Sequence, residues 1–290
     1  MERRWLPSLD RGFESANISH FRDRHPVTPA RSLRIYAQAM PDSTPLAATH
    51  PLPLPREDGW RGAEPPTLAG PVCFGRRQLA SHDGTHPRLR LSPAHAEALA
   101  ELLPVLLCGE ESAALAFDQI ASSGDLQREM RAALARIALD ELEHQTLLQR
   151  IRAALPPPHD GPGLSAGMRR FFMRLASRDP ATHCARIAAV DAGVCLLLRA
   201  LRSGCGPVAT EPTLSSVVAR IHRDEARHVA VTSRQAAQLA GARLVRDDVV
   251  EVRHRLTRLL ERRATSLESL GVDPDRLFRS LQAIPRALRR

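Results

Sequence analysis

Two short stretches of the sequence place a glutamate three residues before a histidine. The first occupies residues 140–144 (Asp-Glu-Leu-Glu-His) and the second residues 224–228 (Asp-Glu-Ala-Arg-His). Successive residues of a helix turn by about 100°, so residues three apart share a face and each glutamate points the same way as its histidine. Carboxylates and imidazoles held together in this way are ligands for divalent metals. We call each stretch a Glu-x-x-His motif.

Both motifs interrupt apolar helix faces. Glu141 and His144 fall within an apolar stripe of residues 134–151, and Glu225 and His228 within one of residues 217–229. Burying such groups is costly unless a partner compensates, so two interruptions, 84 positions apart, predict one shared partner, a metal. The alternative is two solvent-facing Glu–His pairs on arginine-rich helices. Single pairs of that kind are common, but their recurrence on two apolar faces argues against it.

Each motif has a candidate partner acid on the preceding long helix. Glu110 interrupts the apolar face of the first helix, and Asp191 interrupts that of the third. Glu111 is the alternative on the first helix, but it shares its stripe with a proline and an aspartate, so we prefer Glu110. For Asp191 the alternative is a capping or solvated acid.

The candidate ligands divide into two similar half-sites. Each half supplies one single carboxylate and one Glu-x-x-His motif, which suits two oxygen-preferring divalent ions bridged by carboxylates, with one imidazole each. His222 lies three residues before Glu225 on the same face, and is a further candidate ligand. The alternative for His222 is a histidine packed in the core or at the end of the bundle.

The elements that must position these residues are helices. From residue 91 onward the sequence is rich in Ala, Leu and Arg with helical periodicity, and no segment alternates as a strand does. We predict an all-α fold, an antiparallel four-helix bundle within residues 91–241. Ser92-Pro93 and Asp179-Pro180 each place a cap residue before a proline at the first helical position, which predicts a helix start at both points. Because an interior proline breaks or kinks a helix, the first segment should be interrupted at Pro104, with its main helix starting there. The four predicted helices span about 104–122, 125–154, 181–203 and 212–241.

The remaining segments are predicted to frame this bundle. The crossover of residues 155–180 is long enough to run the length of the bundle, and should contain a short helix at about 166–176. Helices at about 246–263 and 274–288, within residues 242–290, should pack on the bundle, with residues 253–263 forming a solvated arginine-rich face. Residues 1–90 are proline-rich without apolar periodicity, so we expect a largely irregular extension and no separate catalytic domain.

These residues resemble the ferritin-like di-iron carboxylate superfamily, whose four-helix core has this arrangement. Residues 109–113 (Gly-Glu-Glu-Ser-Ala) are similar to the first-helix signature of rubrerythrin-type members, and the resemblance covers about 95–240. It implies that Asp140 and Asp224 hydrogen-bond the ligand imidazoles. Asp191 departs from the usual glutamate, and its shorter side chain would leave one ion with an open position. The ligands it implies, with the two motif glutamates as bridges, are Glu110, Glu141, His144, Asp191, Glu225 and His228.

Composition excludes several other classes of protein. All 41 basic residues are arginine, which removes lysine Schiff-base chemistry and the P-loop lysine. The net charge of +9 suits nucleic acid, but the arginines are scattered and only ten aromatic residues are present, so we do not expect that partner. Five cysteines without a Cys-x-x-Cys pair do not suit a zinc knuckle or a disulfide framework. Without an apolar span or a secretory signal, we expect a cytoplasmic location and no membrane partner.

We therefore expect a non-haem di-iron oxidase or oxygenase. It would use O₂ and an external electron donor to hydroxylate, N-oxygenate or desaturate a small organic substrate, with two iron ions or a manganese–iron pair. A rubrerythrin-type peroxidase is disfavoured because its four-cysteine iron site is absent, and a radical-generating reductase subunit because the only tyrosine, Tyr36, lies outside the bundle. The alternative is a bundle without redox activity that acts as a metal-binding or scaffold protein. Whether the chain forms a homodimer stays open.

Overall fold

The computed structural model describes residues 87–122, 126–159, 161–240, 246–285 and 288. All of them fall within one compact unit, residues 47–290. The regular structure of these residues is entirely helical, which confirms the all-α prediction. No helix in the described ranges combines the length and the apolar composition needed to cross a bilayer. The expectation for the N-terminal extension lies outside the described residues, except for residues 87–90, which are irregular.

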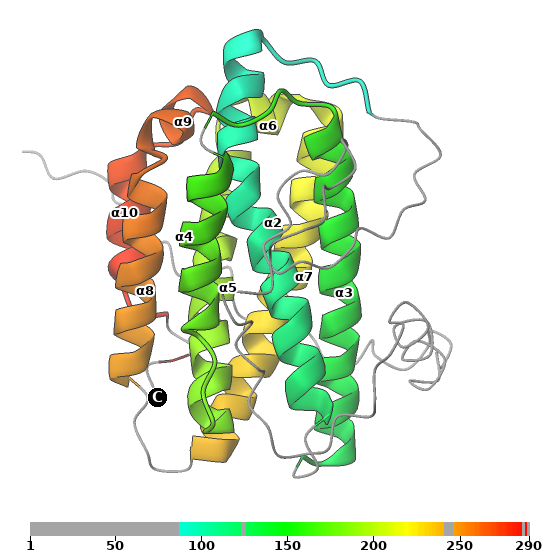
Figure 1. The fold of residues 1–290 in the computed structure, drawn as a ribbon, viewed down its shortest axis with the longest axis vertical. Coiled ribbons are helices and arrows are strands. Elements are labelled where there is room, and N and C mark those ends of the chain that lie inside the picture. The colour runs from blue at the N-terminus through cyan, green and yellow to red at the C-terminus, as the bar shows by residue number, and fades with distance from the viewer. Residues whose placement is uncertain (1–86, 123–125, 160, 241–245, 286–287, 289–290) are drawn as a thin grey trace, which may run out of the picture. The chain divides into compact units, whose positions relative to one another are not determined.

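Four long helices pack as a bundle. They are α2 (Pro93–Ser122), α3 (Arg128–Ala153), α5 (Pro180–Arg202) and α7 (Pro212–Ala240). The closest packing joins α2 to α3 and α5 to α7, so the bundle consists of two helical hairpins. Contacts of α3 with α7 and of α2 with α5 join the hairpins (Figure 1). Each hairpin therefore brings one Glu-x-x-His motif, on α3 or α7, beside the helix that bears its partner acid.

The first helix starts where the Ser92-Pro93 pair predicts, but the predicted interruption at Pro104 is wrong. Helix α2 begins at Pro93 and includes Pro104 as a buried interior residue. Ser92 caps the helix, because its carbonyl accepts from the Ala96 amide and its hydroxyl from the His95 amide. An interior proline removes one backbone hydrogen bond. The helix nevertheless continues through Pro104, whose ring is buried.

The crossover contains α4 (Gly161–Met173), which begins five residues earlier than the predicted short helix. It packs on α2 and also contacts α8. Among its described side chains, Met168, Phe171 and Phe172 are apolar and buried. At the end of the crossover, Asp179 caps α5 by accepting from the Thr182 amide, as the Asp-Pro pair at that point predicts.

The C-terminal helices cover the outer side of α5. Helix α8 (Arg246–Glu261) packs on α5, and α10 (Pro274–Gln282) packs on both. Two short helices, α6 (Pro207–Thr210) and α9 (Ala264–Ser269), were not predicted. Gly193 allows the close approach of α8, because a Cβ atom there would lie 2.5 Å from the Leu256 side chain.

The expectation of a fully solvated face over residues 253–263 is wrong at its first residue. Arg253 is 1% exposed, and its guanidinium donates to the carbonyl oxygens of Ala189 and Leu281. Burial lowers the pKa of Arg253 to about 10. Because these hydrogen bonds reach α5 and the end of α10, Arg253 ties three helices together.

Candidate metal centre

A group of acidic and histidine side chains lies buried in the middle of the bundle. All four bundle helices contribute to it, and each member is at most 5% exposed. The apolar neighbours on each helix face, such as Leu134, Ile137 and Ile221, exclude water from it. The buried acids and histidines are Glu110 and Glu111 on α2, Asp140, Glu141 and His144 on α3, Asp191 on α5, and Glu225 and His228 on α7.

Four of these side chains come close enough to hold one ion. Glu110, Glu141, His144 and Glu225 each offer a ligand atom, and these atoms all lie within 4.8 Å of one another. Nδ1 of His144 is 3.2 Å from Oε2 of Glu110 and 3.4 Å from Oε2 of Glu141. Four of the six predicted ligands, which are far apart in the sequence, thus converge on one point, whereas Asp191 and His228 are not among these four.

The two motif glutamates lie between the two histidines. Oε1 of Glu141 is 2.9 Å from Nδ1 of His228, while its Oε2 faces His144. Oε1 of Glu225 is 3.7 Å from Nδ1 of His144, and its Oε2 is 3.9 Å from Nδ1 of His228. Each carboxylate therefore presents one oxygen to each imidazole. This is the disposition that a carboxylate needs in order to bridge two ions.

Several of these buried atoms lack hydrogen bonds. Among the described residues, no hydrogen-bond partner is found for either carboxylate oxygen of Glu141, either ring nitrogen of His228, or Oδ2 of Asp191. Glu141 and His228 lie within ion-pair distance, but their atoms are not aligned for a hydrogen bond. Leaving buried polar atoms unsatisfied is costly. A cation between them would compensate, so this donor set fits a divalent metal.

The outer nitrogens of both histidines face aspartates. Nε2 of His144 lies 3.2 Å from Oδ2 of Asp224, and Nε2 of His228 lies 3.5 Å from Oδ2 of Asp140. Each histidine thus meets the aspartate of the other motif. Arg227 contacts both aspartates, at 2.7 Å from Asp140 and 3.1 Å from Asp224. A carboxylate at Nε2 favours the tautomer with its proton there, which leaves the Nδ1 lone pair for a metal.

The carboxyl groups of the site influence one another strongly. Burial, followed by repulsion from Glu141, raises the pKa of Glu110, Asp191 and Glu225 well above their usual ranges. Burial also acts to raise the pKa of Glu141, but the contacts with His144 and His228 outweigh it and hold that pKa well below its usual range. Without a metal, the site therefore favours protons on three of its four carboxyl groups.

The histidines respond in the opposite direction. Burial disfavours the charged form of His144, but its contacts with Asp224, Glu110 and Glu141 outweigh this and raise its pKa to about 12. Contacts with Asp140 and Glu141 likewise overcome the effect of burial on His228 and raise its pKa to about 9. In the metal-free site, protons thus supply positive charge that metal ions would otherwise supply. Four carboxylates with two neutral imidazoles carry a charge of −4, which two divalent ions would balance.

Three other candidate ligands are not among the four residues that converge within 4.8 Å. Asp191 is buried and coupled by charge to Glu141 and Glu225, but it is not among the four residues that converge within 4.8 Å. Glu111 is also buried outside those four. His222 lies beside Arg202, with 3.4 Å between its Nδ1 and the guanidinium, and burial together with that arginine lowers its pKa. His222 is not among the four converging residues, and its role as a further ligand stays a prediction.

Two contacts around the buried site were not predicted from the sequence. The first is the crossing of the aspartates between the motifs, and the second is the position of Arg227 against both of them. The sequence does contain a sign of the second contact: the fourth residue of the five-residue stretch is Arg227 in the second motif, where the first motif has Glu143. No model of a protein family, no curated protein and no solved structure matches the chain. A function for the site is therefore inferred from its own side chains.

Proposed function

We propose that the chain is a ferritin-like di-iron carboxylate enzyme that uses O₂ to oxidise a small organic substrate. The observation that supports this most directly is the placement of Glu141 and Glu225, each with one oxygen toward each of two histidines. The charge balance supports the same number of ions. In this proposal the ligands are Glu110, Glu141, His144, Asp191, Glu225 and His228, and manganese in place of one iron would satisfy the same donors.

The residues around the ligands prepare them for metal. Asp140 and Asp224 fix the orientation of the imidazoles, and Arg227 fixes the two aspartates. The apolar stripes keep bulk water away from the centre. When the ions are bound, they supply redox chemistry with O₂ that amino-acid side chains cannot. An external electron donor would then return the ions to their reduced state.

Protons must leave as the ions enter. Both histidines, with pKa values of about 12 and about 9, hold protons at neutral pH in the metal-free site, and the raised pKa values of three carboxyl groups favour protons there as well. Metal ions bind the deprotonated forms, so uptake should release protons and become tighter as the pH rises. The burial that raises these carboxyl pKa values therefore also controls metal loading.

Anaerobic titration with Fe(II) tests this function. We expect two ions per chain by elemental analysis after gel filtration, and an optical change when O₂ is added. A redox-silent scaffold is the alternative, favoured by the ion pair between His144 and Glu110, which satisfies part of the site without metal. Retention of no iron after anaerobic loading would support the scaffold and contradict the enzyme.

A further inference from the structure

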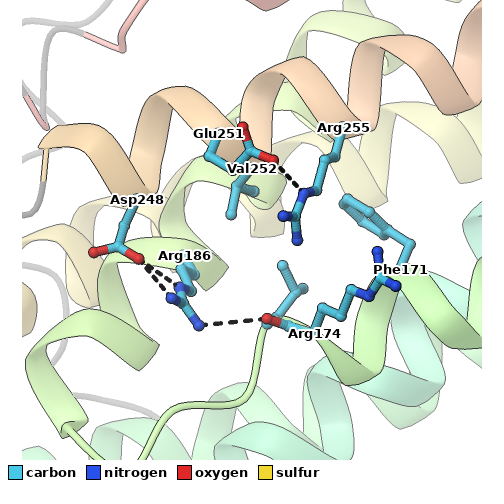
Figure 2. Close-up of a pocket in the computed structure, with 8 residues that line it drawn as sticks. Phe171, Arg174, Arg186, Asp248, Glu251, Val252 and Arg255 are labelled. Carbon is cyan, nitrogen blue, oxygen red and sulfur yellow. Dashed lines mark hydrogen bonds and ion pairs between the residues drawn. The ribbon is translucent and has the colours of Figure 1, made fainter.

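A second cluster of charged side chains lies outside the metal centre, between α4, α5 and α8. It surrounds a small pocket of about 70 Å³ (Figure 2). Phe171, Leu175 and Val252 form its apolar part, and its charged lining consists of three arginines and two acids, Arg174, Arg186, Arg255, Asp248 and Glu251. The lining therefore carries one more positive than negative charge. A space of this size accommodates a few water molecules or one small oxyanion.

The three arginines are not equivalent. Arg186 is engaged by the protein, because it binds Asp248 and donates to the carbonyl oxygens of Arg174 and Ala176. Arg255 uses only its Nε, toward Glu251, and its guanidinium extends from α8 toward Phe171 and Arg174 (Figure 2). In the described part of the chain, no hydrogen bond or ion pair occupies the terminal nitrogens of Arg255 or the guanidinium of Arg174. These groups remain available to a ligand.

We propose that this pocket binds the oxyanion group of a small molecule between Arg255 and Arg174. Guanidinium groups bind carboxylates and phosphates through paired charge-assisted hydrogen bonds, and the apolar side chains beside them suit the carbon skeleton of the same molecule. Both kinds of oxyanion offer this chemistry. The ligand is therefore defined as a small carboxylate or phosphate compound.

The position of the pocket connects it to the metal centre. The ring of Phe171 packs edge-on against that of Phe172, with 5.0 Å between their centroids. Phe172 in turn lies against Gly109, where a Cβ would be 3.5 Å from its ring, and Gly109 precedes the candidate ligand Glu110. A molecule held by its anionic group in the pocket thus lies two aromatic rings away from α2 at the level of the centre. That this molecule is the substrate rests on the proposed function, whereas its binding does not.

Calorimetric titration of the metal-free full-length chain tests the binding. Inorganic phosphate and benzoate would be titrated separately, in a chloride buffer of low ionic strength. We expect saturation by at least one of them, and about tenfold weaker binding after Arg255→Gln or Arg174→Gln, since each change removes charge-assisted hydrogen bonds. Phosphate alone would identify a phosphate compound, and benzoate binding a carboxylate. Circular dichroism would verify that each variant is folded.

Matched controls separate the pocket from general charge. Arg258→Gln on α8 and Arg170→Gln on α4 remove the same charge from exposed positions that do not line the pocket. Their affinities should stay within about twofold of the unmodified chain. An equal loss in the controls, or saturation by neither anion, would overturn the proposal. Separate portions of the same preparations are loaded with Fe(II) under anaerobic conditions, and a failure to bind iron there would count against the di-iron function alone.

Discussion

The two hairpins supply the same kinds of candidate ligand, but they differ in the contact between the single acid and the histidine of each hairpin. In the α2–α3 hairpin, Glu110 reaches the histidine of its own half, with 3.2 Å to Nδ1 of His144. In the α5–α7 hairpin, Asp191 makes no ion pair with any described residue, although it is 4% exposed. Aspartate is one methylene shorter than glutamate, so its carboxylate stops short of the centre. The α5–α7 half therefore lacks the contact between single acid and histidine that the α2–α3 half has.

The hairpins also differ in the charges that surround their histidines. The fourth residue of the motif is Glu143 in the α2–α3 hairpin and Arg227 in the α5–α7 hairpin. Glu143 forms a partly exposed ion pair with Arg220, away from the centre. Arg227 instead contacts the aspartates behind both histidines. The second hairpin thus has fewer contacts between its acid and its own histidine, but its Arg227 contacts the aspartates behind both histidines.

The largest effect should come from the residue that both halves share. Replacing Glu141 with Gln removes the charge between the two histidines, so the iron content should fall from two to below about one per chain, because neither half keeps its full ligand charge. Glu143→Gln, on the same helix but half exposed, is the matched control and should leave two ions bound. Elemental analysis after anaerobic loading measures both. An unchanged iron content in Glu141→Gln would contradict the proposal that Glu141 bridges the two ions.

A pair of alanine variants tests the inequality of the halves directly. Asp191→Ala should empty mainly one metal position, whereas Glu110→Ala removes a ligand that already contacts its histidine and should weaken the other position more. Asp191→Glu should restore occupancy and slow the optical change with O₂, because the longer side chain closes the open position. Equal losses in the two alanine variants would show that the halves are equivalent. Two ions with unchanged O₂ kinetics in Asp191→Ala would make Asp191 a bystander.

Arg227 tests whether one residue supports both histidines. Arg227→Gln should lower the iron affinity about tenfold, as loss of an outer contact typically does, and should affect both metal positions together. Arg220→Gln is the control, since Arg220 pairs with Glu143 rather than with an aspartate behind a histidine. Competition with a chelator measures the affinities. An effect confined to one position would limit Arg227 to a single half-site.

The bundle and the convergence of the motifs could be predicted because both depend on local patterns. Apolar periodicity and capping residues place the helices, and an acid within an apolar stripe must face inward. The continuity of the helix through Pro104 could not be predicted, because the cost of a proline in a helix competes with the burial of its ring, which depends on the rest of the fold. The same limit applies to Asp140, Asp224 and Arg227, since their contacts form between α3 and α7.

The smallest expected effect is a loss of folding stability at acid pH, caused by a buried histidine of the α5–α7 hairpin. His183 on α5 is buried, and burial with repulsion from Arg186 lowers its pKa to about 4. In the unfolded chain this histidine gains its proton near pH 6.5, so the folded state loses stability as the pH falls from about 6.5 toward 4. The loss attributable to His183 should be about 1 kcal/mol between pH 7.5 and 5.5. His183→Gln should remove that part of the loss, whatever constant cost the substitution adds at both pH values.

The free energy of unfolding of the metal-free chain in urea, measured at the two pH values, gives this difference. The control is His254→Gln, at an exposed position on α8. If the difference between the two pH values were the same in His183→Gln as in the unmodified chain, the acid sensitivity would lie elsewhere, in the carboxyl and histidine groups that the two hairpins share.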